Sequence, residues 1–301
     1  MTALIIDGKK IADELQADAA RDVADLREDG IGCTIATLRV GDDYSARLYE
    51  RRLAATAADL GVAHTIVELP SDATQQQACA AIDRLNADPT VSGIVILRPL
   101  PEYIDEVELF CALAPHKDID SVHPENAGLL ALGVPRFVPP TAASAFHVLD
   151  RWVDQTGRDR DAFYHGSLIV VVGRSNNVGK PSIALALDRQ ASVESVDEWA
   201  SRNGQLGWHT RRADVLIVAA GVPELICAEH VREGTVVLDV GTNPVPHGTG
   251  FRIVGDVNFA QVRTRAHALT PVPGGVGPVT DIWLIRNAVA AARSNLDHLN
   301  I

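Results

Sequence analysis

The chain contains few cysteines, and they form no pattern. Its four cysteines, Cys33, Cys79, Cys111 and Cys227, are far apart and make no CxxC pair. The sequence therefore predicts neither a zinc site nor a disulfide framework, and we expect no bound metal. Each cysteine lies in an apolar or helical context, so we expect buried structural thiols in a reducing cytoplasm.

Long apolar runs and an excess of positive charge are also missing. No apolar run approaches the roughly 18 residues that span a bilayer, and the N-terminus lacks the basic start and apolar stretch of a signal peptide. The formal net charge of −12 repels polyanions at long range, which argues against nucleic acid or a membrane surface as a partner. We expect a cytoplasmic protein with a small-molecule ligand.

Apolar residues, by contrast, are abundant enough to build a substantial core or two smaller ones, because 47% of the 301 residues are hydrophobic. Their periodicity predicts strands that alternate with helices, which is typical of parallel βαβ units. We expect an α/β fold with two α/β domains and a boundary near residues 139–140. The expected helices are residues 9–29, 44–60, 71–86 (with Ser71 as N-cap) and about 280–299, and the expected strands are residues 33–40, 62–69, 92–97, 168–172, 193–196, 215–218 and 236–240.

A glycine turn follows the first strand of the second half, between Gly173 and Gly179. Glycines let a backbone turn tightly and approach a phosphate, and the helix that follows offers unpaired N–H groups at its N-terminus. The spacing is not the standard GxGxxG, and Asn176 and Asn177 also fit an ordinary turn. The turn is a candidate dinucleotide site.

The next strand ends in two acidic residues, Asp197 and Glu198. Acids at this place can hydrogen-bond the adenosine ribose of NAD and repel the extra phosphate of NADP, although a solvated strand end is the alternative. Arg174 favours the opposite choice, because a guanidinium near that ribose can hold a 2′-phosphate. The balance favours NAD without excluding NADP.

Seven short stretches, spread over nearly the whole chain, occur together in one order. The most specific is residues 270–280, which is long and rich in glycine and proline. Together they resemble the methylenetetrahydrofolate dehydrogenase/cyclohydrolase family. The stretches are residues 6–9, 40–43, 117–120, 123–128, 172–181, 254–257 and 270–280.

The resemblance implies two α/β domains with a cleft between them. Residues 1–140, completed by a C-terminal helix at residues 280–301, would form the folate-binding catalytic domain, and residues 141–279 a Rossmann-type dinucleotide-binding domain. The resemblance also implies a homodimer formed through the nucleotide-binding domains. The implied reaction is the oxidation of 5,10-methylenetetrahydrofolate to 5,10-methenyltetrahydrofolate with NAD or NADP.

The resemblance also assigns roles to residues. Tyr49 matches the tyrosine that stacks on the aminobenzoyl part of folate, and Asp120 matches an aspartate that contacts the pterin. Taken singly, Tyr49 fits a core residue, and Asp118 and Asp120 fit loop formers; the ordered set favours catalytic and substrate-binding roles for Tyr49 and Asp120. A loop that closes over the folate and the nicotinamide matches Pro273, Gly274 and Gly275. The expected cofactor contacts are Gly173, Arg174, Ser175, Val178, Gly179, Asp197, Glu198 and Thr242.

The sequence departs from the family where the resemblance expects a lysine and its glutamine partner, which assist the cyclohydrolase step. Leu53 and Leu97 occupy these positions, and we expect both to line the folate site. Arg52 is no obvious substitute, because it points roughly 100° away from Leu53 around the helix and a guanidinium does not give up its proton. Residues 140–144 also differ from the family's pattern.

These departures leave three hypotheses. The first is a dehydrogenase with weak or absent cyclohydrolase activity, a subtype in which family members lack the lysine and use NAD. Hydride transfer needs alignment of the reacting carbons and exclusion of water, and it needs no lysine. The second is an enzyme that retains both activities through another polar group. The third is a catalytically silent folate- or nucleotide-binding homologue. The presence of both the cofactor-side and the substrate-side motifs argues against this third hypothesis.

Overall fold

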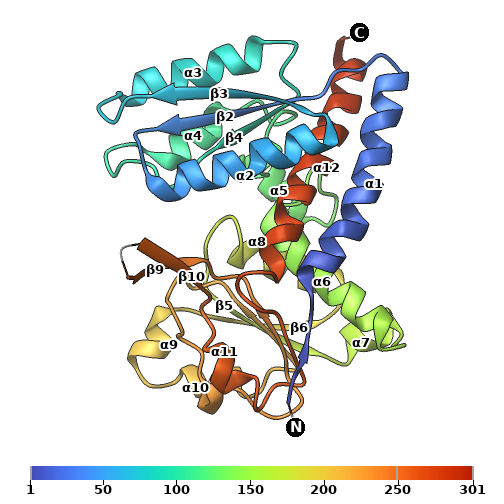
Figure 1. Ribbon diagram of the computed structural model, residues 1–301, viewed down its shortest axis with the longest axis vertical. Helices are drawn as coiled ribbons and strands as arrows, with labels where there is room; N and C mark the ends of the chain where they lie inside the picture. Colours follow the sequence, from blue (N-terminus) through green and yellow to red (C-terminus); the bar gives the residue numbers. More distant parts are fainter. Residues whose placement is uncertain (1, 249, 300–301) are drawn as a thin grey trace. The chain divides into compact units, whose positions relative to one another are not determined.

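The computed structural model describes residues 2–248 and 250–299, with side chains described up to residue 294. The chain forms two compact units (Figure 1). Unit 1 comprises Met1–Asp13 and Thr141–Thr280, and unit 2 comprises Glu14–Pro140 and Asp281–Ile301. Each unit contains a parallel sheet with helices, so the expected fold class of two α/β domains is confirmed. The expected domain limits of 1–140 with 280–301 and 141–279 differ from these units at the N-terminus, where the first strand pairs within unit 1.

Unit 1 has a six-stranded sheet in the order β1-β11-β8-β7-β5-β6, and every neighbouring pair is parallel. Consecutive strands of the chain lie on both sides of β5, which is the arrangement of a Rossmann-type domain. A separate antiparallel pair follows β8. The strands are β1 (Leu4–Ile5), β5 (Leu168–Val172), β6 (Ser192–Val196), β7 (Val215–Val218), β8 (Val236–Asp239), β9 (Asn243–His247), β10 (Gly250–Val254) and β11 (Ala268–Leu269).

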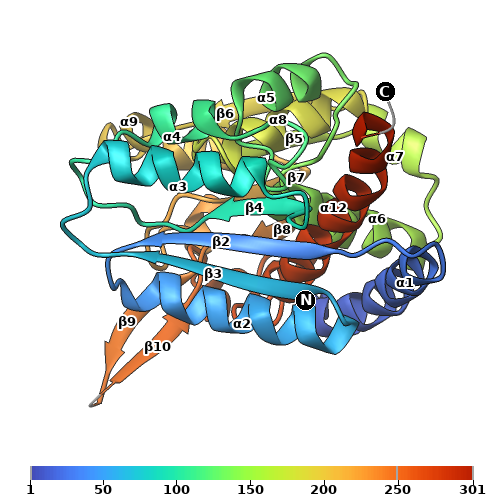
Figure 2. The ribbon, with the colours of Figure 1, turned by 90° about the horizontal axis from the view of Figure 1, so that it is seen from above.

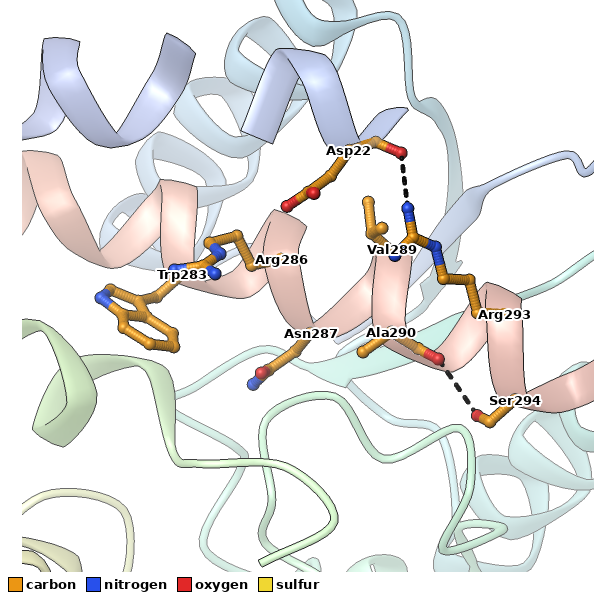
Figure 3. A pocket seen from close by; sticks show the side chains of 8 residues that line it. All are labelled: Asp22, Trp283, Arg286, Asn287, Val289, Ala290, Arg293 and Ser294. Carbon is orange, nitrogen blue, oxygen red and sulfur yellow. Dashed lines mark hydrogen bonds between the residues drawn. The ribbon is translucent and has the colours of Figure 1, made fainter. Parts of the chain in front are cut away.

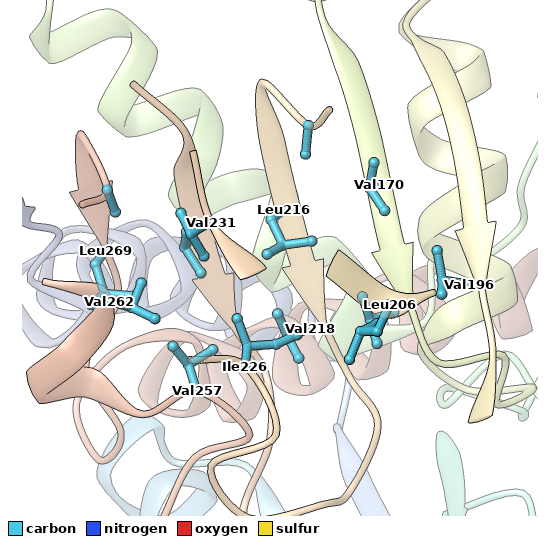
Figure 4. Packing of buried hydrophobic residues seen from close by; sticks show 14 of the residues in the cluster. Val170, Val196, Leu206, Leu216, Val218, Ile226, Val231, Val257, Val262 and Leu269 are labelled. Atoms are coloured by element: carbon cyan, nitrogen blue, oxygen red, sulfur yellow. The ribbon is translucent and has the colours of Figure 1, made fainter. Parts of the chain in front are cut away.

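The core of unit 1 lies against this sheet. Figure 4 shows Val170, Leu216 and Val218 projecting from the strands toward Leu206 and Val262, which come from two short helices. All four residues of β7 and of β8 are buried, so the sheet is covered on both faces and its strands are continuously apolar. Apart from the first residues of two helices that continue in unit 2, the helices of unit 1 are α6 (Pro140–Gln155), α7 (Arg160–His165), α8 (Gly179–Asp188), α9 (Glu198–Arg202), α10 (Leu206–Thr210), η1 (Ala228–His230) and α11 (Phe259–Val262).

Unit 2 is built on a three-stranded parallel sheet in the order β3-β2-β4. In Figure 2, β2 lies between its two neighbours, with α2 on one side of the sheet and α3 on the other. Apolar residues of α3 and α4 pack on one face of β2 and β4. Two helices begin in unit 1 and continue in unit 2, from Glu14 and from Asp281 on: α1 (Gly8–Glu28) and α12 (Val276–Leu299). The other elements are β2 (Thr34–Val40), α2 (Tyr44–Leu60), β3 (Ala63–Leu69), α3 (Gln75–Ala87), β4 (Gly93–Ile96), α4 (Glu106–Ala112) and α5 (Pro124–Ala131).

Local sequence signals explain the bounds of the helices. Helix α2 begins after Asp43, whose side chain accepts from the backbone N–H of Ala46, and it ends at Gly61 in the left-handed conformation. The prediction for the start of α3 was wrong. Thr74, not Ser71, is the N-cap, because Thr74 and Gln77 form a reciprocal capping box.

The cysteines also differ from the expectation of buried thiols. All four are free, but Cys111 is exposed, and Cys33, Cys79 and Cys227 are partly exposed. Cys111 lies on α4 beside Leu109 and Phe110, which take the buried positions of that helix. Among the residues that the structure describes, no helix is long and apolar enough to cross a membrane.

Candidate functional site

The glycine turn between β5 and α8 is shaped by close backbone packing. Gly173 has a φ of 108°, and a Cβ atom added to it would lie 2.1 Å from the carbonyl oxygen of Ala219. A Cβ atom on Gly179 would lie 2.2 Å from the carbonyl oxygen of Gly173. Only glycine fits at either position, because the atoms in the way are backbone atoms that cannot move aside cheaply.

The start of α8 follows the turn directly, and Ser175 pairs its first backbone donors. Val178 is the N-cap residue, and its apolar side chain makes no capping hydrogen bond. Ser175 closes the turn instead, since its Oγ accepts from the N–H of Gly179 at 3.3 Å and its carbonyl accepts from Lys180 at 3.0 Å. The unpaired N–H groups expected here are therefore not found at Gly179 or Lys180, and Pro181 has no N–H. What the turn offers a phosphate is the partial positive charge of a helix N-terminus.

Arg174 and Asp197, which favour opposite cofactors, are paired with each other. The Arg174 guanidinium donates to Asp197 at 2.7 Å and to the hydroxyl and carbonyl oxygens of Ser195 at 2.8 and 2.9 Å. Asp197 also caps α9, accepting from the N–H of Trp199. Glu198 is exposed and pairs with Arg202 along α9. The positive charge of Arg174 is therefore largely balanced at the end of β6.

Two buried aspartates that the sequence interpretation did not single out organise the neighbouring loops. Asp239 accepts from three backbone N–H groups, those of Gly241, Asp256 and Val257, each at 3.0 Å. Burial nevertheless raises the pKa of Asp239 to about 7. Asp256 in turn accepts from the backbone N–H groups of residues 220 and 221, at 2.6 and 2.9 Å. The pair thus fixes the loops after β7 and β8, and Thr242 lies exposed in the second of them.

The glycine-rich loop before α12 packs on the first turn of α1 within unit 1. The N–H of Gly8 donates to the carbonyl of Gly274 at 3.0 Å, and a Cβ atom on Gly8 would lie 1.7 Å from the carbonyl oxygen of Gly275. Gly274 has a φ of 106°, and a Cβ atom on Gly275 would lie 2.5 Å from the carbonyl oxygen of Pro271. The loop that includes Pro273 therefore needs its glycines for internal packing as well as for any ligand.

In unit 2, Tyr49 lies among charged groups. Burial raises the pKa of the Tyr49 hydroxyl, and the carboxylates of Asp281 and Asp120 raise it further, while Arg52 and Arg98 act in the opposite direction. The structure therefore brings the predicted pair Tyr49 and Asp120 into one neighbourhood. It adds Arg98, Arg52 and Asp281, which the sequence interpretation did not place in the site.

Asp120 is positioned by its neighbours in the chain. Lys117 donates to the carbonyls of Leu85, Asn86 and Asp88 and so caps the end of α3, and Asp118 accepts from the backbone of residues 122 and 123. These two residues are loop formers. Asp120 is different, because its partner is the Arg98 guanidinium at 3.4 Å and its side chain stays 22% exposed. Burial raises the pKa of Asp120 against the effect of Arg98.

Leu53 and Leu97 are core residues. Leu53 on α2 is 0% exposed and Leu97 after β4 is 2% exposed. Neither can hold a water molecule or a proton, because a leucine side chain has no polar atom. The two positions at which the resemblance expects polar groups are therefore apolar and dry in this chain.

A pocket of about 560 Å³ runs along α12 in unit 2, and Figure 3 shows its lining. Arg286 packs over the ring of Trp283 at 4.9 Å, and Arg293 donates to the carbonyl of Asp22 at 3.5 Å. None of the residues expected from the sequence lines this pocket. Among the side chains that the structure describes, in residues 2–248 and 250–294, no group of three or more histidine, cysteine, aspartate or glutamate residues could hold a metal ion.

Comparison with known families matches both halves of the chain. Residues 6–120 match the catalytic domain of the tetrahydrofolate dehydrogenase/cyclohydrolase family, and residues 139–296 match the NAD(P)-binding domain of the same family. Together these two matches cover most of the chain.

Individual proteins that are similar to this chain point to the same family. The chain is 53% identical over 296 residues to "Bifunctional protein FolD 3" of Rubrobacter xylanophilus, covering 97% of this chain and 93% of that protein. It resembles the crystal structure of the methylenetetrahydrofolate dehydrogenase-cyclohydrolase of Trypanosoma brucei complexed with NADP and an inhibitor (TM-score 0.90, 33% identity, covering 98% and 99% of the two chains). It also resembles a methylenetetrahydrofolate dehydrogenase from the silkworm Bombyx mori (TM-score 0.86, 33% identity, covering 98% and 99%).

Proposed function

Because the chain belongs to the tetrahydrofolate dehydrogenase/cyclohydrolase family, we propose that it oxidises 5,10-methylenetetrahydrofolate to 5,10-methenyltetrahydrofolate with a nicotinamide nucleotide. The observation that carries the proposal is the pair of family matches, one in each half of the chain. Each half supplies one requirement of the reaction. Unit 1 has a glycine turn directly before the N-terminus of a helix, and unit 2 has Tyr49 and Asp120 beside charged groups.

The glycine turn fits a dinucleotide. Gly173 and Gly179 allow a turn too tight for any other residue, and α8 follows at once, so the positive end of its dipole lies where a pyrophosphate would bind. The nicotinamide, when bound, supplies the hydride acceptor. The chain's own residues orient the folate, through stacking by Tyr49 and a polar contact from Asp120, and they exclude water.

NAD is the nucleotide that this chain's residues favour. Asp197 neutralises Arg174 at 2.7 Å, which weakens the attraction of that guanidinium for a 2′-phosphate. Glu198 beside it is exposed and adds negative charge. The Trypanosoma relative, whose structure holds NADP, is the reason to test both nucleotides.

Hydrolysis of the methenyl product is the second candidate activity. The word "bifunctional" in the name of the Rubrobacter relative supports it, at 53% identity. The silkworm relative is described as a dehydrogenase. In this chain the buried Leu53 and Leu97 argue for slow hydrolysis, since neither offers an acid, a base or a dipole.

One experiment separates these activities. Purified protein is given 5,10-methylenetetrahydrofolate with NAD or NADP, and nucleotide reduction and methenyl absorbance are followed together. We expect reduction of NAD and accumulation of the methenyl product. No reduction of either nucleotide at high enzyme concentration refutes the proposed dehydrogenase, whereas reduction with rapid loss of the methenyl signal establishes both activities. Sedimentation in the same buffer tests the homodimer that we also propose, with an expected mass of twice the chain.

A further inference from the structure

An ion pair beside Tyr49 joins α2 to the start of the last helix within unit 2. The Asp281 side chain is only 4% exposed, and both of its oxygens accept from Arg52, at 2.6 Å from Nε and 3.1 Å from Nη2. A buried carboxylate needs such a partner, because an unpaired charge in the interior is costly. Burial raises the pKa of Asp281, and the guanidinium opposes that shift.

The pair fixes the guanidinium next to the Tyr49 ring. Two parallel N–H···O bonds leave an arginine side chain little freedom to rotate. Arg52 follows Tyr49 by three residues on α2, so the two side chains are neighbours on the helix surface. The guanidinium carbon lies 5.2 Å from the ring centroid, as in a cation–π contact. One face of the ring is thus backed by a cation, so a planar ligand that stacks on Tyr49 would take the other face.

Arg52 also keeps donors that no residue uses. A guanidinium carries five N–H donors, and two of them bond to Asp281. Nη1 makes no hydrogen bond to any residue that the structure describes, and half of the side chain (50%) is exposed. A fixed, partly exposed guanidinium beside an aromatic ring suits a ligand that carries oxygen acceptors next to a ring of its own.

We propose that Arg52, held in place by Asp281, is a specificity residue for folate. Its Nη1 donates to a carbonyl or carboxylate oxygen of the aminobenzoyl-glutamate part, while Tyr49 stacks on the benzoyl ring. Asp281 is a positioning residue that acts through Arg52. The inference rests on the proposed function, because it takes the folate to lie at Tyr49.

The test compares Arg52→Ala with Arg51→Ala, which removes an exposed arginine one position earlier on the same helix. Losing a charged hydrogen bond raises the KM for 5,10-methylenetetrahydrofolate about 10- to 100-fold in Arg52→Ala, with kcat within about threefold and the KM for NAD unchanged. Arg51→Ala behaves as wild type. Added salt raises the folate KM of the wild type more than that of Arg52→Ala, because the variant has lost one charged contact that ions screen.

A second variant distinguishes weaker folate binding from a loss of folding. Arg52→Ala leaves Asp281 buried without a partner, whereas Arg52→Ala with Asp281→Ala removes both charges and is expected to unfold at the wild-type urea midpoint. The double variant keeps the raised folate KM. Asp281→Asn, which retains the guanidinium but loosens it, raises the KM less than Arg52→Ala does.

Titration with tetrahydrofolate keeps this inference separate from the proposed function. If the wild type turns over and the folded double variant has the KM of Arg51→Ala, the role of Arg52 is refuted and the dehydrogenase stands. If the wild type does not turn over, calorimetric binding of tetrahydrofolate decides. Weaker binding in Arg52→Ala than in Arg51→Ala supports the subsite, and equal or absent binding overturns it.

Discussion

Replacing Leu53 by lysine places an amine where the structure holds a fully buried side chain, 0% exposed on the inner face of α2. An isolated ammonium in a dry core gives up its proton, so the pKa of the new lysine falls below its ordinary value of about 10.4. Keeping the amine neutral at pH 7 costs about 1.36 kcal/mol for each pH unit below 10.4. The expected loss in the free energy of unfolding is therefore about 4–5 kcal/mol.

The same arithmetic predicts a pH dependence that identifies the cause. A lysine whose pKa is lowered by folding destabilises the protein less as the pH rises toward the pKa of that lysine in the unfolded chain. The free energy of unfolding of Leu53→Lys relative to wild type should therefore rise by about 2–3 kcal/mol between pH 7 and pH 9. Urea unfolding at both pH values measures this. The matched control is Leu48→Lys, since Leu48 lies on the same helix and is 45% exposed. It is expected to change stability by less than about 0.5 kcal/mol at either pH.

Adding Leu97→Gln connects the stability argument to function. The amide oxygen supplies the acceptor that the resemblance pairs with the lysine, so the double variant should recover about 1–3 kcal/mol. It should also speed loss of the methenyl absorbance by about 10-fold or more over wild type, as positioned acid–base groups do. The reasoning is refuted if Leu53→Lys is as stable as Leu48→Lys at pH 7, or if the wild type already clears methenyltetrahydrofolate far above the no-enzyme control.

Three further outcomes are expected. Tyr49→Ala should weaken tetrahydrofolate binding by about 1–3 kcal/mol, the worth of a stacked ring, and leave nucleotide binding unchanged in the same titration; unchanged folate affinity would make Tyr49 a core residue. Asp197→Asn, which frees the Arg174 guanidinium, should narrow the kcat/KM preference for NAD over NADP by about 1–3 kcal/mol, and a wild type that prefers NADP would contradict this. Asp239, whose pKa folding raises to about 7, contributes stability at low pH that is lost as the pH rises through 7. The urea stability of the wild type should fall by about 2–3 kcal/mol between pH 5 and pH 8 from this group, and the same slope in Asp239→Asn would exclude it as the source.

Much of the fold could be read from local patterns. The apolar runs of β5 and β7 and the span of α2 were predictable because they depend on chain-local physics: side-chain periodicity, a capping aspartate at Asp43 and a left-handed glycine at Gly61. The short helices α9, α10 and α11 were not predicted. Elements of four or five residues carry too little periodicity to stand out, and packing against the sheet is what stabilises them.

Sequence alone also determined which motifs occur and in what order, and these were enough to identify the family. Only the tertiary structure decided which charges meet. Arg174 and Asp197 are 23 residues apart in the chain, and Arg52 and Asp281 are 229 apart. Their pairing depends on strand order and helix packing, which no local pattern encodes. The tertiary structure also separated the roles of Asp118 and Asp120, which lie two residues apart in one loop. Asp118 accepts from a backbone N–H group of that loop, whereas Asp120 stays partly exposed beside Arg98.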